Sequence, residues 1–189
     1  MSCSTKRAVC LTAERAKPLA EIPTGTRVFL DATIFVYHFT GVSPSCRKLL
    51  SRCEAGQLRA LTSAVAVAEV THRLMTIEAV AQGWVQPGNV LKKLRERPEI
   101  VRRLSLYQEQ VDKIPRMGVE VIPLDRPLLA IAFPLRKRYG LLTNDSLLLA
   151  TALSRDAVAF ASADHDFERV ETIQLFQPAD LGEAGYGEG

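Results

Sequence analysis

The sequence has no apolar run that approaches the ~20 residues of a membrane-spanning helix, so we expect no membrane span. Its first 21 residues lack the continuous apolar stretch of a secretory signal. The four cysteines contain no C-x-x-C pair, and two of them lie seven residues apart in a helical pattern typical of buried thiols. These absences favour a reduced, cytoplasmic protein.

The motifs of several enzyme classes are also missing. The chain contains no H-E-x-x-H zinc motif, no G-x-S-x-G elbow and no Walker phosphate loop. Its three histidines are not spaced as zinc ligands. The single E-x-x-H, Glu69 with His72, lacks the second copy that a di-iron bundle needs. Zinc, serine-elbow and P-loop chemistries therefore find no support.

The composition is that of a globular protein, with 47% hydrophobic and 24% charged residues. The net charge of +3 is unevenly distributed along the chain. From residue 164 onward there are seven acidic side chains and one arginine, a balance of −6, which leaves +9 on the first 163 residues. A basic main part favours an acidic partner such as nucleic acid.

Short apolar runs alternate with helical patterns. Strands are predicted at residues 27–31, 58–61, 119–122, 157–161 and 173–176. Helices are predicted at residues 34–39, around 46–53, 63–82, 89–97, 99–113, 126–139 and 146–154. Ser63 has the residue type of an N-cap, and Gly140 that of a C-terminal exit. This alternation predicts an α/β fold, a three-layer α/β/α sandwich with a central, mainly parallel, Rossmann-like sheet.

Three regions are expected along the chain. Residues 1–26 are polar and form an N-terminal extension that is partly mobile. Residues 27–177 form the folded domain, and residues 178–189 form a glycine-rich C-terminal tail. The length agrees with a single domain that buries enough surface to fold without disulfides.

Four acidic residues stand out because they interrupt or directly follow apolar segments: Asp31, Glu69, Asp145 and Asp164. Each also has a purely structural interpretation. Asp31 and Asp145 have the position of helix N-caps, and Asp164 that of a turn residue. Glu69 lies four residues before Arg73, which is a favourable spacing for an ion pair on a helix.

Taken together, the four acids suggest a shared site. The carboxyl ends of parallel strands meet at one edge of the sheet, and Asp31, Asp145 and Asp164 lie at such ends or just beyond them. Carboxylates that converge there repel one another and raise each other's pKa. A hard cation, Mg²⁺ or Mn²⁺, would neutralise such an all-oxygen cluster.

Four segments carry a wider likeness: Asp-Ala-Thr at 31–33, Leu-Thr-Ser at 61–63 with Glu-Val at 69–70, YGLLTNDSLLLATAL at 139–153 and Ser-Ala-Asp-His-Asp-Phe at 162–167. In their order and spacing, the chain resembles the PIN-domain nucleases (PilT N-terminus domain), and in particular the ribonuclease toxins of VapC type. The resemblance runs from about residue 27 to 176. It implies a PIN-like nuclease domain within the sandwich predicted above.

The resemblance also implies site roles. Asp31, Glu69, Asp145 and Asp164 would bind one or two Mg²⁺ or Mn²⁺ ions and act in catalysis, and Asp166 would be an auxiliary metal-binding acid. Three hydroxyls would support the carboxylates or a metal-bound water, namely those of Thr33, Ser63 and Ser162. The segment at 162–167 resembles the family's T-x-D-x-D-F string. Ser162 stands where that string usually has Thr, a change that keeps the hydroxyl.

The implied activity is metal-assisted hydrolysis of RNA, as the toxin of a toxin–antitoxin pair that forms a homodimer. Two other interpretations stay open: a housekeeping RNA-processing nuclease, and a non-catalytic PIN-like module that binds RNA or a protein. The extension and residues 83–116 make the chain longer than a compact toxin. Basic side chains that could hold RNA, or that simply form solvated helix faces, are Arg102, Arg103, Arg136, Lys137 and Arg138.

Overall fold

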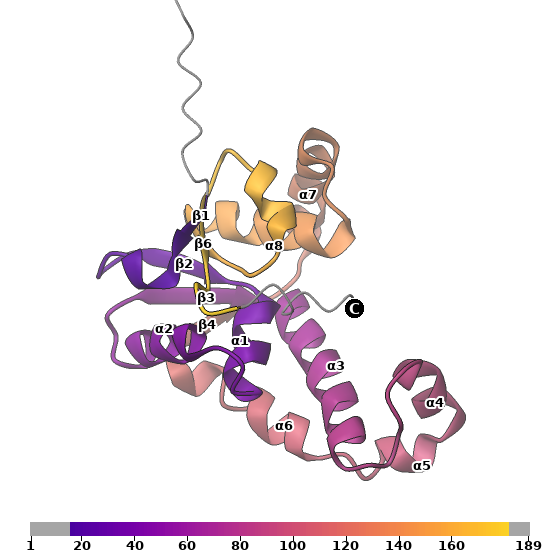
Figure 1. The fold of residues 1–189 in the computed structure, drawn as a ribbon. Coiled ribbons are helices and arrows are strands. Elements are labelled where there is room, and N and C mark those ends of the chain that lie inside the picture. Colours follow the sequence, from indigo (N-terminus) through magenta and orange to yellow (C-terminus); the bar gives the residue numbers. More distant parts are fainter. Residues whose placement is uncertain (1–15, 182–189) are drawn as a thin grey trace, which may run out of the picture.

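The computed structural model describes residues 16–181 and contains one sheet of six strands, all parallel (Figure 1). Their order across the sheet is β1-β6-β5-β2-β3-β4. The bounds are β1 Ala16–Pro18, β2 Arg27–Leu30, β3 Arg59–Ser63, β4 Val119–Ile122, β5 Ala159–Ala161 and β6 Gln174–Gln177. The chain reverses its direction of travel across the sheet between β4 and β5, so β2 lies beside both β3 and β5.

Helices cover both faces of the sheet, as Figure 1 shows for α7 and α8 on one face and α1 and α2 on the other. The α-helices are α1 Ala32–Phe39, α2 Pro44–Glu54, α3 Ala64–Ala81, α4 Val90–Glu96, α5 Pro98–Val101, α6 Leu106–Val111, α7 Arg126–Tyr139 and α8 Thr143–Ser154. Three short 3₁₀ helices are η1 Leu19–Glu21, η2 Pro115–Met117 and η3 His165–Arg169. The predicted three-layer sandwich is confirmed.

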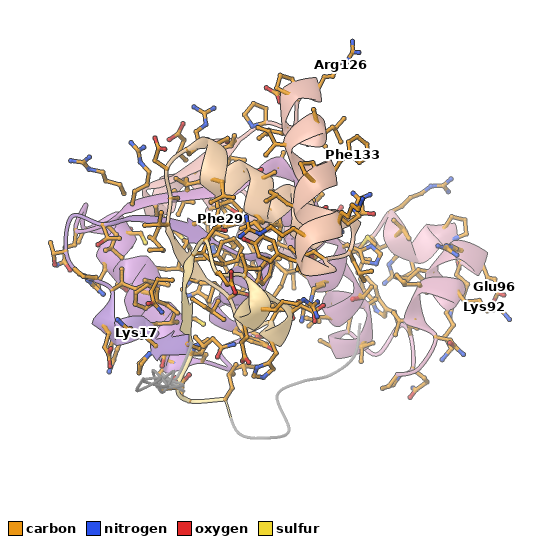
Figure 2. The ribbon with its side chains drawn as sticks, turned by 90° about the horizontal axis from the view of Figure 1, so that it is seen from above. Lys17, Phe29, Lys92, Glu96, Arg126 and Phe133 are labelled. Atoms are coloured by element: carbon orange, nitrogen blue, oxygen red, sulfur yellow. The ribbon has the colours of Figure 1, made fainter. Side chains whose placement is uncertain are left out.

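The core lies where the central strands are buried by helices on both sides. Phe29 of β2 and Phe160 of β5 stack with ring centroids 4.9 Å apart, and Phe160 packs on Phe167 at 4.4 Å. All three rings are 1% exposed or less, and Phe29 lies at the centre of the molecule in Figure 2. Because a parallel sheet is buried on both faces, its strands are continuous apolar runs. This explains why they were detectable in the sequence.

Local signals in the sequence correspond closely to the element ends. The Ser63 hydroxyl accepts a 3.0 Å hydrogen bond from the Ala66 amide and caps α3, as predicted. Gly140 ends α7 in the left-handed conformation, with φ of 64°. Residues 119–122 and 126–139 form a strand and a helix with the predicted bounds.

The single helix predicted at residues 99–113 is wrong. The structure has α5 and α6 instead, separated by residues 102–105. The physical reason is the carboxylate of Glu78, a residue that is only 7% exposed. It accepts hydrogen bonds from the amides of Ser105 and Tyr107, at 3.0 and 2.9 Å, and thereby fixes the start of α6. An apolar periodicity does not reveal such a long-range partner.

Residues 16–22, which the sequence predicts to be part of an N-terminal extension, take part in the fold. β1 pairs with β6, and Leu19 and Ile22 belong to the main core at 2% and 1% exposure. The predicted mobility of residues 1–15 and most of the predicted tail fall outside the described residues. Among residues 16–181, no helix is both long enough and apolar enough to span a membrane.

Candidate active site

Asp31 lies where β2 ends and α1 begins, and its side chain is only 4% exposed. Its Oδ1 atom accepts a 2.6 Å hydrogen bond from the Ala32 amide. Its Oδ2 atom accepts from the Thr33 hydroxyl at 2.7 Å and from the Thr33 amide at 3.4 Å. The residue therefore caps α1. A buried carboxylate needs such donors, because burying an unpaired charge costs several kcal/mol.

Two hydroxyls connect Asp31 to the end of β5. The Ser162 hydroxyl donates to Asp31 Oδ2 at 2.7 Å and accepts from the Asp164 amide at 2.9 Å. The Thr33 hydroxyl accepts from the Ala163 amide at 3.0 Å. Each hydroxyl thus bridges the carboxylate and the backbone just after β5. The network fixes the position of Asp31 relative to Asp164.

Asp164 follows β5 and caps η3, where its Oδ1 atom accepts a 2.8 Å hydrogen bond from the Asp166 amide. Its side chain is half-buried. Asp166 differs, because its Oδ1 atom forms a 2.8 Å ion pair with Arg169 at the surface. The two acids lie two residues apart, but the Asp164 carboxylate is held by a backbone amide and the Asp166 carboxylate by an arginine.

Glu69 lies in the second turn of α3, where the apolar segment 64–70 packs toward the sheet edge. Its carboxylate is 3.8 Å from Arg73 Nη1, which is the ion pair expected from the i, i+4 spacing. Both side chains remain about one third exposed. A hollow of about 490 Å³ lies beside Glu69, lined also by His72, Leu124 and Asn144. Glu69 therefore faces space that a ligand could enter.

Asp145 lies in the first turn of α8, which begins at Thr143 and has Leu142 as its N-cap residue. The interpretation of Asp145 as an N-cap is therefore wrong, because the helix starts two residues before it. A negative charge in the first turn is still favoured by the helix dipole. The side chain is half-buried, and its neighbour Asn144 lines the hollow beside Glu69.

The structure brings these four acids to one edge of the sheet, close enough to affect one another's ionisation. Burial first, and then the Asp31 charge, raise the pKa of Glu69 to about 7 against the opposing effect of Arg73. Burial and the charges of Asp164 and Asp31 raise the pKa of Asp145 to about 6. Burial also raises the pKa of Asp164. Four anionic groups repel here, so a cation would stabilise the ionised forms.

The donor set matches a hard divalent ion, because the acids that face this edge supply only oxygen atoms. As positioned, however, no three His, Cys, Asp or Glu side chains within residues 16–181 form a ready metal-binding group. The ion pairs of Glu69 with Arg73 and of Asp166 with Arg169 hold two carboxylates toward arginines.

Of the predicted supporting hydroxyls, Ser63 has a different role. Its oxygen accepts from the Ala66 amide as the cap of α3, whereas Thr33 and Ser162 contact Asp31. The reason is its position: Ser63 is the last residue of β3, and α3 begins at the next residue.

The three basic residues of α7 predicted to bind RNA differ in their contacts. The Arg136 guanidinium donates from Nε and Nη2 to the Ser146 hydroxyl at 3.3 and 3.2 Å, directly beside Asp145 in sequence. Lys137 is exposed. Arg138 lies 3.8 Å from Glu171. Ser146 was not singled out from the sequence, although a serine next to an acid in an apolar helix is a usable signal.

Arg102 and Arg103 do not lie near the acids. They follow α5, at the far end of α3 from Glu69 (Figure 1). Along the helix, the 12 residues from Glu69 to Ala81 span about 18 Å, at about 1.5 Å each. The guanidinium of Arg103 stacks over Trp84, 4.3 Å from the ring centroid. These two arginines therefore belong to a different surface.

Comparison with known proteins adds a family match. The family model described as PIN domain matches residues 28–173. The chain is 24% identical over 153 residues to "Ribonuclease VapC6" of Methanocaldococcus jannaschii, covering 80% of this chain and 97% of the relative. It is 22% identical over 151 residues to "Ribonuclease VapC2" of the same organism, covering 80% and 93%.

Among solved structures, the chain is similar to one described as VapBC2 from Rickettsia felis bound to a DNA fragment from their promoter. The TM-score is 0.54 at 16% identity, over 81% of this chain and 99% of the other. A toxin-antitoxin complex from Klebsiella pneumoniae matches with a TM-score of 0.48 at 19% identity, over 77% and 94%. The first likeness supports the fold described above.

Proposed function

Because this chain belongs to the PIN domain family, whose model matches residues 28–173, we propose that it is a ribonuclease dependent on Mg²⁺ or Mn²⁺. Its reaction is the hydrolysis of RNA phosphodiester bonds. The observation that carries the proposal is the set of four carboxylates at one sheet edge, two of them with pKa values raised to about 7 and 6. The ribonuclease names of both curated relatives support the substrate.

Asp31, Glu69, Asp145 and Asp164 are the proposed ligands, with Asp166 as an auxiliary one. A bound divalent ion lowers the pKa of a water molecule and offsets the charge that develops on phosphoryl oxygens. The protein's own contribution is positioning. Thr33 and Ser162 hold Asp31 through Oδ2, which leaves the Oδ1 atom with a single hydrogen bond, from Ala32. Arg136, which donates to the hydroxyl of Ser146 next to Asp145 in the sequence, is the proposed contact for an RNA phosphate.

The toxin of a toxin–antitoxin pair is the proposed biological role, with a small antitoxin protein as partner. The VapC names of the relatives and the VapBC description of the Rickettsia felis structure support it. The role is tested by inducing the chain in cells with and without the product of an adjacent small gene. Growth arrest that this product relieves supports the toxin. Normal growth on induction of the active chain favours a processing nuclease.

A homodimer is also proposed, with its contact on α7. Exposed apolar side chains are concentrated on and near this helix: Leu129 is 42% exposed, Phe133 63% and Leu142 73%. Figure 2 shows Phe133 directed away from the core. Apolar surface of this kind is typical of protein contacts.

The test of the chemistry uses purified protein and a labelled RNA, with Mn²⁺ or with EDTA. We expect cleavage only with the metal, and none from Asp145→Asn. Asp156→Asn is the matched control, because Asp156 is exposed and lies outside the acid cluster. Titration calorimetry with Mn²⁺ gives a second measurement that does not depend on turnover. Cleavage that survives both EDTA and Asp145→Asn would overturn the proposal.

A further inference from the structure

A small lobe at the far end of α3 carries the net positive charge of the molecule. We define this α4–α5 lobe as residues 83–104, which contain six basic and two acidic side chains, a balance of +4. Since the whole chain has a net charge of +3, all other residues together have −1. The basic residues are Lys92, Lys93, Arg95, Arg97, Arg102 and Arg103. The lobe is therefore a segment with a marked excess of positive charge, whereas the charges of the remaining residues nearly cancel.

Several of these cations have partners within the lobe, but two do not. Lys92 pairs with Glu96 at 3.9 Å, and Arg97 with Glu99 at 3.3 Å, both at the surface. Arg95 and Arg102 are exposed and form no ion pair with any residue from 16 to 181. Exposed ion pairs contribute little to stability, so the paired cations also remain available to a polyanion.

The lobe has an apolar core of its own, which holds this surface in place. Ala79 of α3, Val85, Leu94, Ile100 and Leu104 form a buried cluster separate from the main core. Trp84, the single tryptophan of the chain, packs against this cluster with Arg103 over its ring. A hollow of about 470 Å³ borders the same tryptophan and is lined also by Lys93 and Arg97.

We propose that the α4–α5 lobe is a second RNA-binding surface, which contacts phosphates of a strand whose scissile bond lies at the acid cluster. This inference rests on the proposed ribonuclease function. Arg95 and Arg102 are the principal phosphate contacts. At the ~3.4 Å per nucleotide of a stacked strand in a duplex, the ~18 Å from Glu69 to the end of α3 corresponds to about five nucleotides. The substrate class is thus RNA that extends at least this far from the cut.

Trp84 provides a direct test, because its fluorescence reports on the lobe alone. The titration uses full-length Asp145→Asn protein in EDTA, so that no RNA is cleaved, with oligouridylates of 4 and 20 nucleotides. We expect the 20-mer to change Trp84 emission at concentrations where the 4-mer has no effect. Unchanged Trp84 emission on addition of saturating 20-mer would overturn the inference. That result is also the one expected if the lobe binds an acidic protein instead of RNA.

Paired substitutions locate the contact. Arg95→Gln with Arg102→Gln removes two lobe charges, and Arg47→Gln with Lys48→Gln removes two exposed charges from α2 as the control. For single strands, each lost phosphate contact lowers the slope of log affinity against log salt by about 0.7. We expect the lobe variant to lose about 1.4 from this slope, with the control unchanged. Equal losses in both variants would contradict the proposal.

The outcome is separable from that of the proposed function. If the wild-type protein cleaves no RNA but the lobe variant still weakens RNA binding, the chemistry fails and the lobe remains an RNA-binding surface. If RNA is cleaved and the lobe variant reduces kcat/KM equally for short and long RNA, the ribonuclease stands and the lobe inference fails.

Discussion

Asp31 and Ser162 are 131 positions apart in the chain, and the Ser162 hydroxyl donates a 2.7 Å hydrogen bond to the Asp31 carboxylate. Asp31 directly follows β2 and Ser162 directly follows β5, and these two strands are neighbours in the sheet. The pair therefore links the two halves of the candidate site through a buried contact. Parallel pairing creates this proximity, because it brings strand ends from distant parts of the sequence to one edge.

Ser162→Ala should lower the free energy of unfolding by about 1–3 kcal/mol, because it leaves the Asp164 amide without its hydrogen-bond acceptor and removes one of the donors to Asp31 Oδ2, which keeps those of Thr33. Urea denaturation in EDTA measures the change without any metal contribution. Ser154→Ala is the control, since this exposed serine makes only a local bond to Thr151 and its loss should cost less than about 0.5 kcal/mol. Equal costs at both positions would contradict the network.

Asp145→Asn should abolish RNA cleavage and raise the melting temperature in EDTA at pH 8. Burial and the charges of Asp164 and Asp31 raise the pKa of Asp145 to about 6, so at pH 8 its ionised side chain destabilises the fold, and asparagine removes that charge. Thermal unfolding followed by circular dichroism measures the shift. A variant that melts below the wild type under these conditions would argue against repulsion among the acids.

Without metal, stability should fall as the pH rises from about 4 to about 7. The folded chain raises the pKa of Glu69 from 4.5 to about 7, so in this window it holds a proton that the unfolded chain has released. Raising the pH removes this proton at a cost to the folded state. Glu69→Gln should flatten the dependence, and Glu120→Gln, at an exposed residue of β4, should not. Melting temperatures in EDTA across this range provide the test.

Gly118→Ala should destabilise the protein more than Gly140→Ala. Both glycines have positive φ, 71° and 64°, which costs about 1–2 kcal/mol for a residue with a Cβ. Only at Gly118 would the Cβ also lie 2.7 Å from a backbone oxygen, that of Cys53. At Gly140 nothing lies within 4 Å. The urea midpoints of the two variants measure the cost of the positive φ with the clash, at Gly118, and without it, at Gly140. Similar midpoints would contradict the prediction, because they would show that the backbone around Gly118 relaxes to relieve the clash.

Phe133→Glu should convert a homodimer to a monomer with little change in the stability of the fold. The ring is 63% exposed, so its loss removes little intramolecular packing. Sedimentation velocity measures the change, with Val158→Glu as a control at another exposed apolar residue, which is 58% exposed and lies just before β5. A wild-type protein that sediments as a monomer would refute the proposed dimer.

Much of the fold could be read from the sequence because its signals are local. Strands buried on both faces appear as apolar runs, as at Phe29 and Phe160, and helix ends carry their own caps, as at Ser63 and Gly140. The break between α5 and α6 could not be read in this way. It depends on Glu78, a residue 27 positions before Ser105, whose carboxylate is buried against the amides of another helix.

The sequence by itself determined the α/β/α class and the identity of the four acids, since both depend on residue type and on position relative to predicted strands. Only the tertiary structure decided their surroundings: Asp31 is buried by hydroxyls from two elements, Glu69 pairs with Arg73, and Asp145 lies inside its helix rather than at its cap. The tertiary structure also places Arg102 at the far end of α3 from Glu69. Burial and proximity across the sheet arise from packing, which residue spacing along one chain does not encode.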